Sequence, residues 1–286
     1  MAGTMGREGR VFPEYDSDGF VHNEASGFSL YMQERCKRIF FIRHAEGFHN
    51  LAERESTVVP KVNILLAENS GDKYVDARLT PFGEQQCAKL KANIRGDTVW
   101  GFDKPLNLDL VVCSPLTRCL QTAVLSLGDP GAPGAPPFIV NELCRERIAD
   151  YTCDRRRKRS VLKADFPSIN FDLVKDEEDT MFLNQKEGDS KEGEAKCSER
   201  GVEFLKWLCG RPEIHIAVVT NSVFLKSLFS QFGSNLSRED QECIHKFPAN
   251  AEMRSIMLCA HRKLASTKEE GEQPPNKRQK TLWNGA

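Results

Sequence analysis

The chain has 286 residues, a formal net charge of -1 at pH 7 and 40% hydrophobic residues. This length and composition predict a globular protein with a sizeable core and exclude a fibrous or wholly disordered chain. The nearly balanced charge excludes a global attraction to nucleic acid or to anionic membrane, so any basic cluster acts locally.

The ten cysteines are scattered from Cys36 to Cys259, without a CxxC pair or a Cys/His cluster at zinc spacing. The first residues contain no apolar signal segment, and we expect a reducing compartment. Cytoplasm is the first expectation and nucleus the second, because "PPNKRQK" (Pro274–Lys280) is a short basic cluster that import receptors recognise. No apolar run approaches the roughly 18 residues that cross a bilayer, so no membrane partner is expected.

The two ends of the chain differ from the middle in composition. Residues 1–36 are rich in Gly, Asp, Glu and Ser, and residues 264–286 are polar and contain Pro. We predict that both ends are poorly ordered and flank one folded domain at 37–263. Two polar stretches inside that domain, 56–75 and 165–193, are expected to leave its core.

Between the two ends, short apolar runs alternate with helical patterns. Continuous apolar runs suit strands that are buried on both faces. The alternation therefore predicts an α/β three-layer sandwich, with a mostly parallel central sheet flanked by helices. The expected strands are Ile39–Ile42, Leu108–Cys113, Phe138–Val140 and Ile216–Thr220, and the expected helices are Thr80–Arg95, Leu116–Leu127, Glu194–Gly210 and Ser222–Phe232.

Charged residues follow three of the expected strands at the point where each strand ends. The stretch "RIFFIRHAEGFHN" runs from an apolar strand into Arg43 and His44, Arg118 opens the helix after the second strand, and Glu142 follows the third. Ligands bind beyond the carboxyl ends of parallel strands, and a helix N-terminus favours an anion. An Arg-His pair at a strand end is often only structural. A functional role for Arg43 and His44 therefore depends on the order of all these motifs along the chain.

Taken in order, "RHAEG", "RLTPFGEQQC", "VVCSPLTRCLQTA" and "FIVNELCRER" resemble the histidine phosphatase superfamily. The chain looks most similar to the phosphoglycerate mutase-like proteins of plants and fungi, over about residues 38–260. The resemblance implies a phosphoglycerate mutase-like fold and hydrolysis of a small phosphorylated substrate, with neither metal nor cofactor. In this family a histidine attacks phosphorus and becomes transiently phosphorylated.

By this resemblance His44 is the nucleophile, and Arg43 and Arg118 hold the phosphoryl oxygens as guanidinium forks. Glu142 matches the acid that protonates the leaving group, and the alternative for it is an ion pair with Arg145 or Arg147. For Thr80 the alternative is a helix N-cap before Pro81. The expected substrate contacts are Arg43, Asn50, Thr80, Arg118, Ser222 and Arg145.

A basic run follows Glu142 and includes Arg145, Arg147 and the stretch Arg155–Arg159. It predicts a basic rim for an anionic phosphomonoester, and a solvated charge run is the alternative. Nucleic-acid binding by this run is not expected, because interleaved aromatic residues are absent.

The pattern departs from the family at the last expected strand, where the family carries a second histidine and this chain has Asn221 before Ser222. A protonated histidine donates a charged hydrogen bond, roughly twice as strong as the neutral bond from an amide. We predict turnover reduced by roughly 10 to 1000-fold relative to Asn221→His. His49 is not expected to compensate, because five residues after His44 it points to a different helical face. Ala45 replaces the hallmark Gly, as in the plant group, and is not counted against activity.

Two other functions stay open. The chain could bind phosphoryl groups without turnover, as a pseudophosphatase, or transfer phosphate between phosphoglycerates, as a mutase. The segment Leu51–Arg78 does not resemble the corresponding segment of true mutases, which favours a hydrolase.

Overall fold

The structure, a computed structural model, describes residues 36–56, 65–95, 106–186, 192–234 and 236–260. Both ends of the chain that were expected to be poorly ordered lie outside the described residues, apart from Cys36, and so does the basic cluster Pro274–Lys280. Parts of the two polar stretches, 57–64 and 187–191, also lie outside them. No helix in the described ranges is long and apolar enough to cross a membrane.

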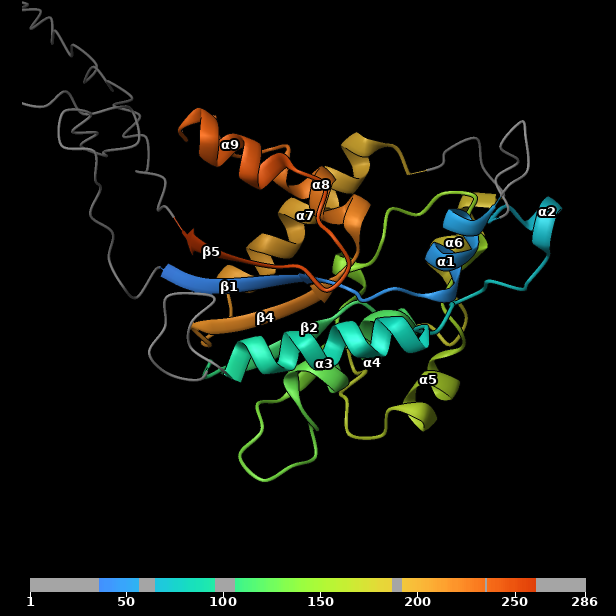
Figure 1. The fold of residues 1–286 in the computed structure, drawn as a ribbon, viewed down its shortest axis with the longest axis horizontal. Coiled ribbons are helices and arrows are strands. Elements are labelled where there is room, and N and C mark those ends of the chain that lie inside the picture. Colours follow the sequence, from blue (N-terminus) through green and yellow to red (C-terminus); the bar gives the residue numbers. More distant parts are fainter. Residues whose placement is uncertain (1–35, 57–64, 96–105, 187–191, 235, 261–286) are drawn as a thin grey trace, which may run out of the picture. The chain divides into compact units, whose positions relative to one another are not determined.

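Five strands form one sheet in the order β3-β2-β4-β1-β5 (Figure 1). The first four pair in parallel, and β5 pairs antiparallel with β1 at the edge. This mostly parallel sheet with helices on both sides confirms the predicted fold class. The bounds are β1 Cys36–Arg43, β2 Leu110–Cys113, β3 Phe138–Val140, β4 His215–Thr220 and β5 Met253–Cys259.

The sequence analysis missed β5. From Arg254 to Leu258 of this edge strand half-buried and exposed positions alternate, in contrast to the almost wholly buried β2 and β4. The apolar part of this strand, "IMLC" (Ile256–Cys259), is as long as "IFFI" but was not recognised as a strand.

The four expected helices are present, with bounds that differ by one to three residues. Helices α3 (Pro81–Arg95) and α4 (Thr117–Leu127) cover one face of the sheet, and α7 (Glu194–Cys209) and α8 (Ser222–Phe229) cover the other (Figure 1). The remaining helices are α1 Phe48–Glu55, α2 Ala67–Ser70, α5 Arg159–Asp165, α6 Thr180–Lys186 and α9 Arg238–His245, with the 3-10 turns η2 Glu142–Cys144 and η3 Thr152–Asp154.

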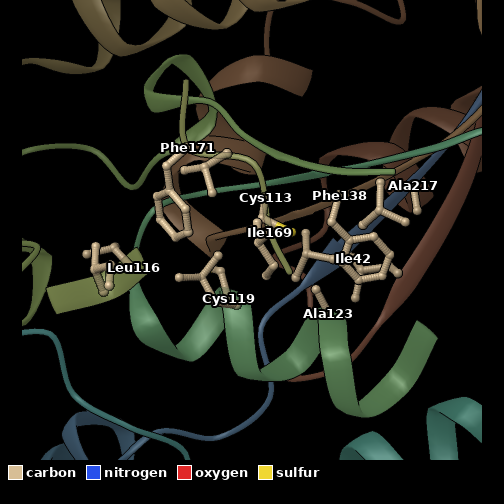
Figure 2. Close-up of a cluster of buried hydrophobic side chains, with 14 of the residues drawn as sticks. Ile42, Cys113, Leu116, Cys119, Ala123, Phe138, Ile169, Phe171 and Ala217 are labelled. Carbon is tan, nitrogen blue, oxygen red and sulfur yellow. The ribbon is translucent and has the colours of Figure 1, made fainter. Parts of the chain in front are cut away.

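Alternate residues of β1 belong to two hydrophobic clusters. Phe40 and Ile42 pack on the α4 side, whereas Ile39 and Phe41 pack on the side of α7 and α8. Burying each such side chain contributes roughly 1.5–3 kcal/mol, so the sheet is held from both faces. Figure 2 shows Ile42 of the first cluster on the side of Ala123 of α4.

Part of the stretch 165–193 corrects the expectation that this stretch leaves the core. Ile169, Phe171 and Val174 are buried and belong to the cluster on the α4 side; Figure 2 labels the first two. Ile169, Phe171 and Leu173 alternate with polar residues, a strand-like period that was overlooked among the charged residues of this stretch.

Candidate active site

A cavity of about 210 Å³ opens beyond the carboxyl end of β1, next to the start of α8. Its walls come from segments far apart in the chain, because the parallel strands end at the same edge of the sheet. The polar residues that line it are Arg43, His44, His49, Asn50, Glu53, Arg118, Glu146, Arg147, Tyr151, Cys153, Asp154 and Ser222.

His44 directly follows β1 and is almost completely buried. Its backbone N–H donates to the Thr220 carbonyl at 2.9 Å, and its ring Nδ1 lies 2.7 Å from the Ala45 carbonyl oxygen. A carbonyl oxygen only accepts, so Nδ1 carries the proton and Nε2 keeps its lone pair. Burial, together with the cations Arg118 and Arg43, lowers the pKa of His44 well below 6.5. The imidazole is therefore neutral at pH 7 and suited to nucleophilic attack.

Two guanidinium groups accompany this imidazole. Arg43 donates from Nη1 to the Pro248 carbonyl at 2.8 Å and lies over the ring of Phe247 at 5.6 Å, while its Nε is buried without a partner in the described part of the chain. Arg118 is buried and donates to the Cys153 carbonyl and to Asp154. Both predicted arginines thus line the cavity with His44.

Asn221 lies behind Arg118 rather than in the cavity wall. Its Oδ1 accepts from Nε of Arg118 at 3.1 Å, and its Nδ2 donates to Oγ of Ser114 at 3.2 Å. The side chain is fully buried. Asn221 consequently helps to hold the guanidinium in place, whereas its neighbour Ser222 reaches the cavity at the start of α8.

The two glutamates of "ELCRER" are placed differently. Glu142 does not line the cavity, and its Oε1 accepts from Nε of Arg156 at 2.8 Å. Glu146 lines the cavity, and its carboxylate accepts backbone N–H bonds from Val223 at 3.2 Å and Phe224 at 2.8 Å. Sequence reasoning missed Glu146, although it follows Glu142 by four residues in the same motif.

Thr80 and Arg145 are both buried and both lie away from the cavity. The Thr80 hydroxyl accepts from the Gly83 N–H at 3.0 Å, which is the helix-cap alternative for this residue. Arg145 binds Asp179 through two 2.7 Å hydrogen bonds. These contacts occupy the Thr80 hydroxyl and the Nη atoms of Arg145, whereas the buried Nε of Arg145 has no partner in the described part of the chain.

The basic run is largely structural. Arg156 is buried and donates to the carbonyls of Asp176 and Glu178, and Arg157 pairs with Asp76. Of the arginines in this run, only Arg147 lines the cavity. These side chains therefore do not form an extended basic rim, because most of them bind carbonyl or carboxylate groups of neighbouring loops.

Asn50, on α1, lines the cavity as expected, and its Oδ1 accepts from the Gly47 N–H at 3.1 Å. Sequence reasoning missed Asp154 as a cavity residue, and it considered His49 but did not expect it to take part. His49 is buried with its ring 5.5 Å from that of His44, and Asp154 is paired with Arg118. Burial raises the pKa of Asp154 to about 6, although Arg118 opposes this rise.

Within the described residues, no group of three or more His, Cys, Asp or Glu side chains is arranged to hold a metal ion. The cationic side chains in the cavity wall are Arg43, Arg118 and Arg147. A cavity with a neutral imidazole, guanidinium groups and carboxylates can bind a phosphoryl group, accept it on nitrogen and exchange a proton with it.

Comparison with known proteins gives the family. The profile of the histidine phosphatase superfamily (branch 1) matches residues 39–264. A phosphoglycerate mutase-like protein of Arabidopsis thaliana is 32% identical over 276 residues, covering 88% of this chain and 95% of the relative. Phosphoglycerate mutase-like protein 1 of the same plant is 31% identical, covering 84% and 88%.

Among solved structures, phosphoserine phosphatase from Entamoeba histolytica is 19% identical with a TM-score of 0.41, covering 76% of this chain and 89% of its own. The family assignment does not depend on this structural likeness, because it follows from the profile and the plant relatives. The chain belongs to the histidine phosphatase superfamily, branch 1.

Proposed function

We propose that this protein hydrolyses phosphomonoesters through a phosphohistidine on His44. The observation that carries the proposal is the state of that imidazole: its Nδ1–H is bound to the Ala45 carbonyl, and its burial keeps the ring neutral. An imidazole so fixed presents the lone pair of Nε2 as the nucleophile. Arg43 and Arg118 border the same cavity and would neutralise the phosphoryl oxygens.

The reaction proceeds in two displacements. In the first, Nε2 of His44 bonds to phosphorus, the ester P–O bond breaks, and a carboxylic acid gives its proton to the leaving oxygen. In the second, the resulting carboxylate takes a proton from water, the water oxygen bonds to phosphorus, and the N–P bond breaks to release phosphate. One carboxyl group thus serves first as acid and then as base.

We assign that role to Glu146 in place of Glu142. Glu146 lines the cavity that contains His44, whereas Glu142 is held by Arg156 outside it. Asp154 also borders the cavity, but its carboxylate is paired with Arg118 at 2.9 Å. A proton donor must reach the leaving oxygen, and Glu142, which lies outside the cavity, does not meet this condition.

A reduced turnover is the finer part of the proposal. Asn221 stands where the resemblance leads one to expect a second histidine, and its amide is occupied by Arg118 and Ser114. A pseudophosphatase is the second candidate, favoured by the engagement of Arg118 with Asp154, a carboxylate that competes with a phosphoryl group.

The test is a rapid quench of the protein with p-nitrophenyl phosphate in EDTA. We expect hydrolysis, and acid-labile phosphate on His44 by mass spectrometry. Label on another residue, with His44→Ala still active, would refute the mechanism. Vanadate binding without any hydrolysis would support the pseudophosphatase, and exchange of phosphate between phosphoglycerates in preference to water would support a mutase.

A further inference from the structure

His49 is the second histidine of the cavity, and no step above uses it. It lies in the first turn of α1 and is buried, with 5% of its surface exposed. Its ring lies 5.5 Å from the His44 ring, and both rings border the same cavity. The sequence separation of five residues predicted divergent directions, but the chain turns between β1 and α1 and brings the two rings together.

Gly47 makes room for this position of the ring. A Cβ at residue 47 would lie 2.7 Å from Nδ1 and 2.8 Å from Cε1 of His49, too close for any side chain. The backbone of Gly47 is extended, with φ at -98°, so any residue could adopt its conformation. The side-chain contact with His49 is therefore a main reason for glycine here, together with the nearby Arg78 carbonyl at 3.2 Å.

The two nitrogens of His49 differ in their surroundings. Nδ1 is buried and has no hydrogen-bond partner in the described part of the chain. A buried N–H without an acceptor is rarer in proteins than an acceptor without a donor. The proton of the neutral ring therefore belongs on Nε2, the nitrogen left to reach the cavity.

We propose that His49 is a catalytic residue, which donates a hydrogen bond from Nε2 to a phosphoryl oxygen as a neutral imidazole. This inference deepens the proposed phosphatase function and rests on it. It gives the site a ring N–H donor beside Arg43 and Arg118 while Asn221 is turned toward Arg118 and Ser114.

The electrostatic surroundings agree with a neutral donor. Burial, and then the positive charges of Arg118 and Arg43, lower the pKa of His49 well below 6.5. Charged and titratable groups from several segments border the cavity together with this ring. They are Arg43 and His44 from the end of β1, Glu53 from α1, Arg118 from α4, and Glu146, Arg147, Tyr151, Cys153 and Asp154 from the segment after β3.

The decisive comparison uses two side-chain amides. The amide nitrogen of Gln reaches about as far as Nε2 of histidine, whereas that of Asn ends near the Nδ1 position. We expect His49→Asn and His49→Ala to lower kcat/KM by about 100-fold, the cost of one well-aimed donor. His49→Gln should stay within about tenfold of the parent. A purely structural role would not separate Gln from Asn in this way, and comparable losses in both would overturn the proposal.

Vanadate supplies a readout that does not need turnover. Calorimetric titration should show vanadate affinity falling with kcat/KM in His49→Asn, with inorganic phosphate affinity changed only a few-fold. If the parent binds vanadate but does not hydrolyse esters, the proposed function fails. The titration then still tests whether His49 donates a hydrogen bond to the bound oxyanion. If the parent hydrolyses esters and vanadate affinity does not depend on residue 49, this inference alone fails.

A pH series tests the neutral state. The ratio of parent to His49→Asn activity should stay constant from pH 6 to 9, since titrations of the other cavity groups affect both proteins. A ratio that falls toward alkaline pH would mean an imidazolium donor and would overturn the proposal as stated. His215→Gln, a change at an exposed histidine beside Asp109 and outside the cavity, is the matched control and should leave the activity unchanged.

Gly47→Ala tests the position of the ring without touching its chemistry. The added methyl should displace the imidazole and reduce kcat/KM by at least about tenfold in the parent. In the His49→Ala background the same change should cost no more than a few-fold, because the clash is gone. Equal losses of kcat/KM in both backgrounds would show that glycine is needed at residue 47 because of the nearby Arg78 carbonyl. That result would contradict the proposed position of the His49 ring. Circular dichroism of each variant confirms that it folds.

Discussion

Nε of Arg118 donates a 3.1 Å hydrogen bond to Oδ1 of Asn221, and both side chains are sealed from solvent. The same guanidinium binds the Cys153 carbonyl at 2.5 Å and Asp154 at 2.9 Å. Three acceptors on two segments therefore fix the plane of one cation in the cavity wall. Such a fork needs arginine, because a lysine ammonium is a point charge on a flexible stem.

Arg118→Lys should accordingly lower kcat/KM by about 100-fold or more and also destabilise the fold. Asp154 is left with an imperfect partner in the interior, and breaking a buried pair typically costs about 3–5 kcal/mol. Steady-state kinetics and urea denaturation measure the two effects. Arg147→Lys, at a partly exposed cavity arginine, should cost under about 1 kcal/mol. Equal destabilisation by both changes would contradict the role given to the Arg118 network.

The assignment of the acid predicts a dependence on the leaving group. Glu146→Gln should slow hydrolysis of alkyl phosphates by about 100 to 10,000-fold, because an alkoxide needs the proton. With p-nitrophenyl phosphate the formation of phosphohistidine should slow far less, since that leaving group departs without protonation. Single-turnover kinetics with both esters measure this difference.

Two control variants accompany Glu146→Gln. Glu142→Gln, which removes a charge outside the cavity, should show no preference between the two esters. Asp154→Asn tests the other cavity carboxylate. A leaving-group effect in Asp154→Asn and none in Glu146→Gln would transfer the acid role to Asp154.

The lowered pKa of His44 predicts a loss of stability on acidification. The unfolded chain takes up this proton near pH 6.5, whereas the folded chain takes it up only at much lower pH. The unfolded state therefore binds more protons below pH 6.5, and the free energy of unfolding falls as the pH decreases. At pH 5.5 the loss from this one group is on the order of 1 kcal/mol.

Denaturation of the parent and of His44→Asn at pH 7.5 and 5.5 isolates this contribution. The variant should lose less stability over that interval. The comparison is needed because Asp154 acts in the opposite direction: its raised pKa, about 6, makes the folded state bind a proton more readily. The same loss in both proteins would mean that His44 is already protonated in the folded state.

The sequence predicted the strands of the fold where a continuous apolar run marks them. It predicted the residues of the candidate site only in part. Apolar runs located β1 to β4, and Arg43, His44 and Arg118 followed from the strand ends. Glu146 and Glu142 are alike in sequence and differ only in what folds against them: the start of α8 for one, Arg156 for the other. Pairings between distant segments decide such cases, and a single motif contains no information about them.

The position of the His49 ring could not be predicted from the sequence either. The helical spacing rule applies within one helix, but residues 44 to 47 precede α1, so the rule does not govern the angle between the two rings. The glycine at residue 47 was the available signal. Glycine at an N-cap is common, however, and its contact with an imidazole is visible only in three dimensions.

Asn221→His is the final prediction. Restoring an imidazole where the family resemblance places one should raise kcat by at least about tenfold, with substrate affinity within a few-fold, because the added positive charge acts mainly on the transition state. The new imidazole must be protonated to help, so the variant should gain an alkaline limb in its pH profile that the parent lacks. The gain should be larger in the His49→Asn background, where a donor is missing, and this non-additivity would couple the two positions. Asn221→Ala is the control, and should lower activity because it leaves Nε of Arg118 without its acceptor. An unchanged rate and an unchanged alkaline limb in Asn221→His would mean that residue 221 acts only through Arg118 and that this site is organised around the amide.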